Sequence, residues 1–255
     1  MDNLIWEIAG MSACGPVRAQ NEDAIDFDQE HGIMVLADGL GGHNAGEVAS
    51  AMVVRRVGAQ LRAAVEEGVF ADGRLLCERL KQAGERANAE VHAAGQEDPA
   101  RAGMGSTMVA AVIRGLTLYL AHVGDSRAYL LRDGALQVVT HDHTMLQEAI
   151  ELGLVKEPYP GAVKRRSLLT RAIGTAEEVE VDTQTVELRA TDVVMIASDG
   201  LFEPVPDADM AATLGKPVPL QDIATELIDL AIKLDSDDNL SVILARMNDR
   251  ARQEQ

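Results

Sequence analysis

The chain has 255 residues, of which 47% are hydrophobic and 25% charged, a composition typical of a globular protein that can bury a large core. Its 23 basic and 41 acidic residues give a formal net charge of −18, which repels a phosphate backbone and argues against a nucleic-acid partner. An anionic substrate would therefore need the positive charge of a metal ion or an arginine at its binding site.

The sequence carries no sign of export or membrane insertion. Residues 1–7 lack the basic region of a signal peptide, and the longest apolar stretch, residues 107–113, is far shorter than the roughly 20 residues of a membrane span. Cys14 and Cys77 are far apart and show no metal-binding spacing, which favours reduced thiols, with a redox role for Cys14 as the alternative. We therefore expect a cytoplasmic protein without a membrane partner.

The first hundred residues predict two strands and two long helices. Residues 4–9 and 33–37 are short apolar runs bounded by turn residues, which is typical of strands. Apolar residues recur at helical spacing through residues 45–67 and 73–94, and both segments are rich in alanine, glutamate and arginine.

From residue 105 onward, short strands alternate with tight turns. The Asp133-Gly134 pair is a strong hairpin signal, and such close spacing requires antiparallel neighbours. The predicted strands are residues 106–113, 116–123, 128–131, 135–139, 179–188, 192–197 and 240–247.

Two further helices are predicted, over residues 144–152 and 220–234, and Thr144 with Gln147 fits a capping box at the start of the first. Residues 155–166 contain two prolines and a glycine and indicate an exposed loop. Strands and helices come in blocks and no linker divides them. We therefore expect one α+β domain over residues 1–247, with antiparallel sheets covered by helices, and a polar tail over residues 248–255.

Four aspartates share one kind of position: each is read as lying just past an apolar strand, beside a glycine or a small residue. They are Asp38, Asp125, Asp199 and Asp238. A strand holds such a carboxylate rigidly, and Mg²⁺ and Mn²⁺ prefer oxygen ligands of this type. Any one Asp-Gly pair is usually just a turn. Four similar placements favour a shared metal site.

The motifs around these aspartates resemble those of the PP2C (PPM) family of metal-dependent protein serine/threonine phosphatases, in their bacterial form. Residues 18–23, Arg-Ala-Gln-Asn-Glu-Asp, and residues 37–43, Ala-Asp-Gly-Leu-Gly-Gly-His, match its two opening motifs. The later motifs follow in the family's order at residues 104–107, 123–129, 142–144, 169–174, 198–201 and 238–239, so the resemblance runs from Arg18 to about Arg246.

The resemblance implies an α-β-β-α sandwich of two central antiparallel sheets flanked by helices, with two Mn²⁺ or Mg²⁺ ions at one end. It also implies the activity, hydrolysis of phosphoserine and phosphothreonine by a metal-activated water. Matched residue by residue, Asp38 would bridge the two ions, the Gly39 carbonyl would bind one, and Asp199 and Asp238 would complete the other. Asp125 would help Asp199 to hold a weaker third ion.

The same matching gives supporting roles to the residues nearby. Glu22, Asp23 and Asn239 would orient ligands and waters by hydrogen bonds. Arg18 would grip the phosphate with its planar fork of donors, and a surface ion pair with a nearby acid is the alternative. Leu40 stands where eukaryotic members have a histidine, so His43 is the nearest candidate for the general acid, although it could equally cap the following helix.

Three side-chain groups lie outside the expected centre. His141 and His143 are interpreted as structural, with His143 fixing the start of a helix. The basic triplet Lys164-Arg165-Arg166 could recruit an acidic or phosphorylated peptide, but a solvated loop explains it as well.

Two other functions compete with the phosphatase. A binding module that has lost its metals is disfavoured, because three converging carboxylates without cations would repel one another. Another two-metal hydrolase, such as a nuclease or a small-molecule phosphatase, is the third hypothesis, and net charge argues against the nuclease. The family resemblance further implies phosphoprotein substrates, an opposing Hanks-type kinase, a monomeric catalytic domain and a role such as secretion control.

Overall fold

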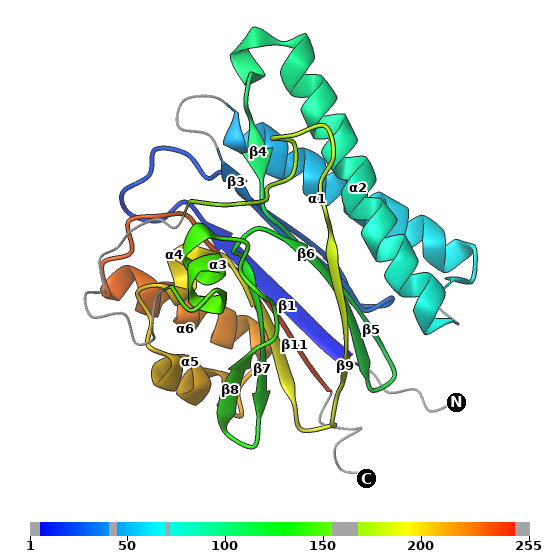
Figure 1. Ribbon diagram of the computed structural model, residues 1–255. Coiled ribbons are helices and arrows are strands. Elements are labelled where there is room, and N and C mark those ends of the chain that lie inside the picture. Colours follow the sequence, from blue (N-terminus) through cyan, green and yellow to red (C-terminus); the bar gives the residue numbers. More distant parts are fainter. Residues whose placement is uncertain (1–5, 41–44, 70–71, 155–167, 248–255) are drawn as a thin grey trace.

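Two β-sheets lie face to face at the centre of the computed structural model, which describes residues 6–40, 45–69, 72–154 and 168–247 (Figure 1). Every pairing within them is antiparallel. The first sheet consists, in spatial order, of β1 (Trp6–Ala13), β11 (Leu240–Met247), β10 (Val193–Ala197), β7 (Arg127–Arg132) and β8 (Ala135–Val138). The second consists of β2 (Asp23–Asp28), β3 (Ile33–Leu40), β5 (Met108–Arg114), β6 (Thr117–Val123) and β9 (Asp182–Glu187), with β4 (Gly105–Ser106) paired to β3.

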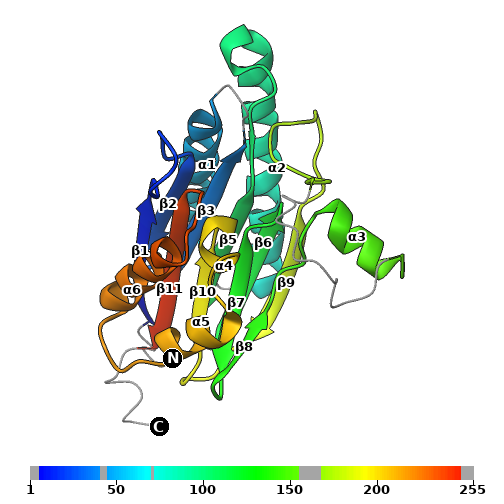
Figure 2. The same ribbon diagram turned by 90° about the vertical axis from the view of Figure 1, so that its left-hand side faces the viewer.

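Helices cover the outer face of each sheet (Figure 2). The long helices α1 (Gly46–Glu66) and α2 (Gly73–Glu97) pack on the second sheet, and the short 3₁₀ helix η2 (Pro99–Arg101) follows them. The helices α4 (Asp199–Phe202), α5 (Asp207–Leu214) and α6 (Leu220–Lys233) pack on the first. The α-β-β-α sandwich expected from the sequence is confirmed.

Strand β3 lies in the middle of these layers and is buried on both faces. Val35 packs toward α1 and α2, whereas Leu36 faces the opposite sheet. Both are fully buried, which explains why the strand is a continuous apolar run rather than an alternating one. A strand packed from both sides is a rigid support for the aspartate at its end.

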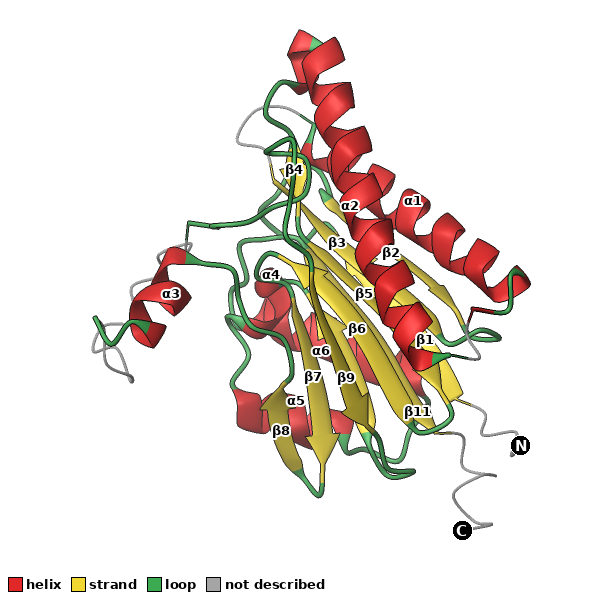
Figure 3. Ribbon diagram, turned by 45° about the vertical axis from the view of Figure 1, so that its right-hand side comes forward, coloured by secondary structure: helices red, strands yellow, loops and turns green. Residues whose placement is uncertain are grey.

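Two local predictions are also confirmed. Asp133 and Gly134 turn the β7–β8 hairpin with φ angles of 53° and 79°, the left-handed conformation that an Asp-Gly turn supplies. Thr144 begins α3 (Met145–Glu151), and its hydroxyl accepts a hydrogen bond from the Gln147 N–H at 3.2 Å, which is the Thr144 half of the predicted capping box. The Gln147 side chain instead donates to Oε1 of Glu151 at 3.2 Å. Helix α3 stands away from the sandwich in Figures 2 and 3 and contains no buried residue.

Some elements differ from the predictions. Strand β1 extends to Ala13, beyond the predicted end at residue 9, and β9 is shorter than residues 179–188. Strand β2 was missed because aspartates interrupt its apolar pattern; it lies at a sheet edge, where Asp26 pairs with Arg62 of α1 at 2.7 Å. Helices α4 and α5 were missed as well.

No helix in the described ranges combines the length and the apolar run that a bilayer crossing needs.

Candidate metal centre

Five aspartates meet at one end of the sandwich. Asp38 lies near the end of β3, directly opposite Asp23 at the start of β2. Asp125 lies in the turn between β6 and β7, Asp199 is the first residue of α4 after β10, and Asp238 lies two residues before β11. Both sheets therefore contribute carboxylates to the same end, as the sequence predicted for Asp38, Asp125, Asp199 and Asp238.

Burial and mutual repulsion raise the pKa of these carboxyl groups. The pKa of Asp38 lies well above its ordinary value because the group is buried and because Asp23, Asp199 and Asp125 repel its charge. Burial, with repulsion from Asp125 and Asp238, raises the pKa of Asp199 to about 8. Burial also raises the pKa of Asp125 and of Asp23 to about 6 each. Clustered carboxyl groups of this kind are destabilised as anions unless cations are present.

The cluster has the features of a cation site. Among the described residues, no donor reaches Oδ1 of Asp199 or Oδ1 of Asp23, although both atoms are buried. A bound cation would satisfy such oxygens, and hard divalent ions accept carboxylate ligands readily. At Gly39, a Cβ atom would lie 2.3 Å from the Gly46 carbonyl oxygen and 2.5 Å from that of Glu22, so the backbone there approaches its neighbours too closely for any side chain. The residues present fit Mn²⁺ or Mg²⁺.

Arg18 contacts the centre through Asp238. Its Nη2 atom lies 2.7 Å from Oδ2 of Asp238, and its Nε donates to the Asp237 carbonyl at 3.2 Å. The ion pair that the sequence left open as an alternative is therefore present, but its acid is a predicted metal ligand. Because the Arg18 side chain is 30% exposed, the guanidinium also faces the solvent from which a phosphate would arrive.

Asn239 fastens the loop between β1 and β2 to the start of β11. Its Oδ1 accepts the Glu22 N–H at 2.8 Å, and its Nδ2 donates to the carbonyl oxygens of Cys14 and Gln20 at 2.8 and 2.9 Å. The loop that carries Arg18 and Glu22 is thus held over the acidic cluster. Burial raises the pKa of Glu22, and the positive charge of Arg18 opposes the rise.

Hydroxyl groups that sequence reasoning did not single out complete the surroundings of the cluster. The Asp38 N–H donates to Oγ1 of the fully buried Thr107 at 2.9 Å, and that hydroxyl also bonds to Ser126 at 2.7 Å. Ser198 donates its hydroxyl to Oδ2 of Asp23 at 2.8 Å. Each of these residues lies within a quoted family motif, which was the signal available in the sequence.

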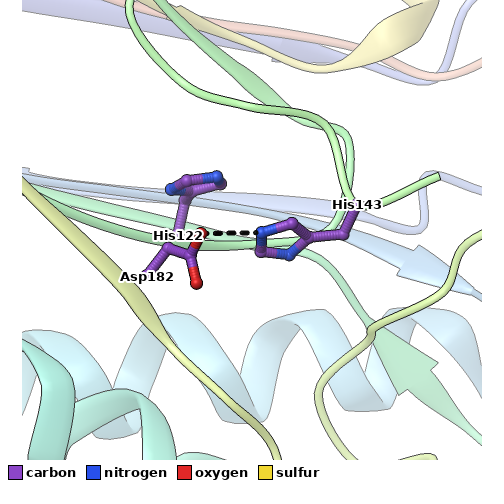
Figure 4. A group of neighbouring side chains, drawn as sticks. All are labelled: His122, His143 and Asp182. Atoms are coloured by element: carbon purple, nitrogen blue, oxygen red, sulfur yellow. Dashed lines mark ion pairs between the residues drawn. The ribbon is translucent and has the colours of Figure 1, made fainter. Parts of the chain in front are cut away.

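A second cluster of potential metal ligands lies beside this centre (Figure 4). One ligand atom from each of His122, His143 and Asp182 lies within 4.8 Å of the other two. The two imidazole rings stack, with centroids 4.7 Å apart and planes inclined by 24°. Nitrogen lone pairs lie in the ring planes, so those of two nearly parallel rings do not converge on one ion.

The hydrogen bonds of His143 point to the same conclusion. Its Nδ1 accepts the Gly124 N–H at 3.1 Å, so the proton of the neutral ring belongs on Nε2, which faces Asp182 at 3.4 Å. A protonated nitrogen cannot bind a metal. Burial, together with the neighbouring charge of His122, lowers the pKa of His143 to about 4 and keeps the ring neutral. We interpret this cluster as structural, as the sequence suggested for His143.

Two predicted groups lie outside the described residues. His43, the candidate general acid, falls in the gap at residues 41–44. The basic triplet Lys164-Arg165-Arg166 falls in the gap at residues 155–167. Their assignments stay predictions.

The sandwich and its buried carboxylates define a metal-binding protein of the α-β-β-α class. The model of the protein phosphatase 2C family matches residues 17–231, and the chain belongs to this family. It is 37% identical over 246 residues to the serine/threonine protein phosphatase PstP of Mycobacterium tuberculosis, a match that covers 96% of this chain and 46% of that relative. The chain thus spans about half the length of the mycobacterial protein.

A shorter relative matches along nearly its whole length. The chain is 32% identical to the serine/threonine phosphatase stp of Listeria innocua, over 92% of this chain and 93% of the relative. Solved structures agree with both comparisons. The crystal structure of mycobacterial PstP superposes with a TM-score of 0.86 at 35% identity and covers 96% of this chain and 100% of that one. The catalytic domain of PstP in complex with two manganese ions has a TM-score of 0.82 at 35% identity, with 96% and 99% covered.

Proposed function

We propose that the chain is a metal-dependent protein phosphatase that hydrolyses phosphoserine and phosphothreonine with Mn²⁺ or Mg²⁺. The observation that carries the proposal is the convergence of four mutually repelling carboxylates at one end of the sandwich: the buried groups of Asp38, Asp125 and Asp199 and the half-buried one of Asp238. Such a cluster destabilises the folded protein unless cations are bound. Membership of the phosphatase family supplies a function for bound cations at this place. When bound, two such ions would activate a water and neutralise charge on the phosphate.

The family motifs suggest which residue would bind which metal ion. Asp38 would contact both ions of the core pair, the Gly39 carbonyl one of them, and Asp199 and Asp238 the other. Asp125 would serve a third ion together with Asp199. The supporting evidence is the position of all five residues at strand ends of the same end of the fold.

Arg18 would bind the phosphate. Its fork of donors suits two phosphate oxygens, and the partly exposed pair with Asp238 costs little to rearrange. Glu22, Asp23 and Asn239 would hold the loop and the ligands in place. His43 remains the candidate for protonating the leaving alkoxide.

The biological setting follows from the relatives. Serine/threonine protein phosphatases of bacteria are the relatives that match, so phosphoproteins are the proposed substrates and a bacterial serine/threonine kinase the opposing enzyme. The proposal includes a monomeric enzyme, as the family resemblance implies, located in the cytoplasm. A solved neighbour is described as PppA, a regulatory component of a secretion system in Pseudomonas aeruginosa; at 29% identity and a TM-score of 0.75 it keeps secretion control among the candidate roles.

One assay tests the proposal. Phosphate release from a phosphothreonine peptide is measured with Mn²⁺, with EDTA, and for the variants Asp38→Asn and Asp199→Asn. We expect turnover that needs Mn²⁺ and falls by at least about 100-fold in both variants. Asp26→Asn is the matched control, because Asp26 pairs with Arg62 on β2 outside the cluster and its loss leaves turnover intact.

Other outcomes would support the competing functions. A chain that binds Mn²⁺ but releases no phosphate from any substrate would be a binding module. A chain that prefers a sugar phosphate or DNA over the phosphopeptide would be another two-metal hydrolase.

A further inference from the structure

The segment Asp142–His143 grips the turn that carries Asp125 from both sides. Before Asp125, Gly124 exchanges two hydrogen bonds with His143: the His143 N–H donates to the Gly124 carbonyl at 3.0 Å, and the Gly124 N–H donates to Nδ1 of His143 at 3.1 Å. After Asp125, Arg127 donates from Nε and Nη2 to the two carboxylate oxygens of Asp142 at 2.9 and 2.7 Å. Asp125 therefore lies in a turn with both of its flanks fixed.

Arg127 also contacts the helix that presents Asp199. Its guanidinium carbon lies 4.3 Å from the centroid of the Phe202 ring, within the range of a cation–π contact. Phe202 is the last residue of α4, and Asp199 is the first. One side chain thus joins the turn that carries Asp125 to the short helix that carries Asp199.

The contact matters because Asp125 and Asp199 repel each other. Each carboxylate is largely buried, and the charge of Asp125 is the strongest electrostatic influence on Asp199 after burial itself. Two such groups tend to move apart unless the structure holds them or a cation joins them. A bidentate arginine–carboxylate pair fixes distance and direction at once, which a single hydrogen bond does not.

We propose that Arg127 and Asp142 are positioning residues that hold Asp125 and Asp199 at the separation needed to share one cation. The inference rests on the proposed function, because it takes both aspartates as metal ligands. Neither Arg127 nor Asp142 touches the substrate in this scheme. Their effect reaches the centre through the backbone on either side of Asp125 and through α4.

Strand β7 supplies its own matched control. At its other end, Arg132 donates from Nε and Nη2 to the two oxygens of Asp192 at 3.0 and 2.6 Å. Asp192 is fully buried, so this pair is at least as sheltered as the one between Arg127 and Asp142. The two pairs share strand, chemistry and geometry, and they differ in their distance from the proposed metal ligands.

Mn²⁺ binding to the full chain tests the inference. Titration calorimetry, together with the electron paramagnetic resonance signal of free Mn²⁺, gives the number of bound ions and the Kd of each. In Arg127→Lys and Asp142→Asn we expect the Kd of the weakest bound ion to rise by about 10-fold or more, the usual effect of losing a group that orients a metal ligand. Lysine keeps the charge but lacks the planar fork. Arg132→Lys and Asp192→Asn are expected to lower the Tm while leaving all Kd values within about twofold.

Three results would overturn the inference. One is a set of Kd values in Arg127→Lys and Asp142→Asn that matches the control variants, and another is a wild-type chain that binds only two ions. If both variants fail to fold, Phe202→Leu keeps an apolar side chain but removes the cation–π contact, together with the ring contact to Tyr129, and is expected to raise the same Kd about threefold. An unchanged Kd in Phe202→Leu is the third result. Failure of the phosphatase assay with normal Mn²⁺ binding would count against the proposed function and leave the inference standing.

Discussion

Asp23 and Asp38 lie directly opposite each other in the antiparallel pair of β2 and β3, and burial raises the pKa of both. Ser198 donates to Asp23 from the opposite sheet at 2.8 Å, so this carboxyl group cannot turn away from its neighbour. Without cations, such carboxyl groups keep protons that they would release in water. Cation binding must displace those protons, and metal affinity therefore rises with pH.

The metal-free protein should become less stable as pH rises toward 8. The pKa of Asp199 is about 8 in the folded state against 3.8 in the unfolded chain. Between these values the folded state holds a proton that the unfolded state has released, so the free energy of unfolding falls with increasing pH. The lowered pKa of His143, about 4, makes the free energy of unfolding rise with pH, but this rise ends by about pH 7, where the histidine is neutral in the unfolded chain as well.

Urea unfolding in EDTA between about pH 7 and pH 8 measures the Asp199 contribution together with that of Asp38, whose pKa is also raised. We expect a loss of up to about 1 kcal/mol across this interval. Mg²⁺ at saturating concentration should remove the trend, and Asp199→Asn should reduce it without metal, because Asp38 still holds a raised pKa. A stability that rises over the same interval would contradict the raised pKa.

Arg18 should matter for phosphate binding more than for metal binding. In Arg18→Ala, kcat/KM for a phosphothreonine peptide is expected to fall by about 10-fold or more, because a bidentate contact to the phosphate is lost. The Kd for Mn²⁺ should stay the same or improve, since Arg18 no longer competes for Asp238 at 2.7 Å. Parallel titration and steady-state kinetics check both values.

Arg62→Ala provides the comparison. Arg62 forms a similar pair with Asp26, also at 2.7 Å and partly exposed, on the outer strand β2. Replacing Arg62 with alanine should change neither kcat/KM nor the Kd for Mn²⁺. If Arg18→Ala instead weakened Mn²⁺ binding and left kcat/KM per loaded enzyme unchanged, its role would be structural.

The imidazole pair beside the centre should hold no metal. In His122→Ala we expect the same number of bound Mn²⁺ ions as in the wild type. We also expect a stability loss of about 1–3 kcal/mol, because Nε2 of the buried His122 ring lies 2.8 Å from the His141 carbonyl oxygen. Metal content after dialysis against Mn²⁺ or Zn²⁺ measures the first value, and urea unfolding the second. One ion fewer in this variant and in Asp182→Asn would show that the stacked rings of Figure 4 do bind metal.

The sequence revealed the parts of the centre that depend on local pattern. Asp38 and Asp199 could be placed because each follows an apolar run, and such runs predict strands whatever packs around them. The turn at Asp133-Gly134 was predictable for the same reason, since its geometry depends on the two residues themselves.

Features that depend on contacts between distant segments could not be predicted. Strand β2 has aspartates among its apolar residues, and Asp26 is explained by Arg62, 36 positions later on α1. The contact of Arg127 with both Asp142 and Phe202 joins segments that no local pattern connects. The pair of Arg18 with Asp238 spans 220 positions. In each case charge and burial become informative only when the fold brings the partners together.

Gly39 should tolerate no substitution. A Cβ atom at this position would lie 2.3 Å from the Gly46 carbonyl oxygen and 2.5 Å from the Glu22 carbonyl oxygen, and both are backbone atoms that cannot rotate away. Gly39→Ala must therefore move α1 or the loop before β2. We expect the free energy of unfolding to fall by more than about 3 kcal/mol and Mn²⁺-dependent turnover to be lost.

Gly134→Ala is the control. Gly134 has a φ of 79° but open space around it, so the substitution costs only the backbone strain, about 1 kcal/mol, and turnover is kept. Urea unfolding and the phosphopeptide assay measure both variants. Equal stabilities for the two would mean that the backbone around Gly39 yields easily, and the close approach of β3 to the start of α1 would then not fix the position of Asp38.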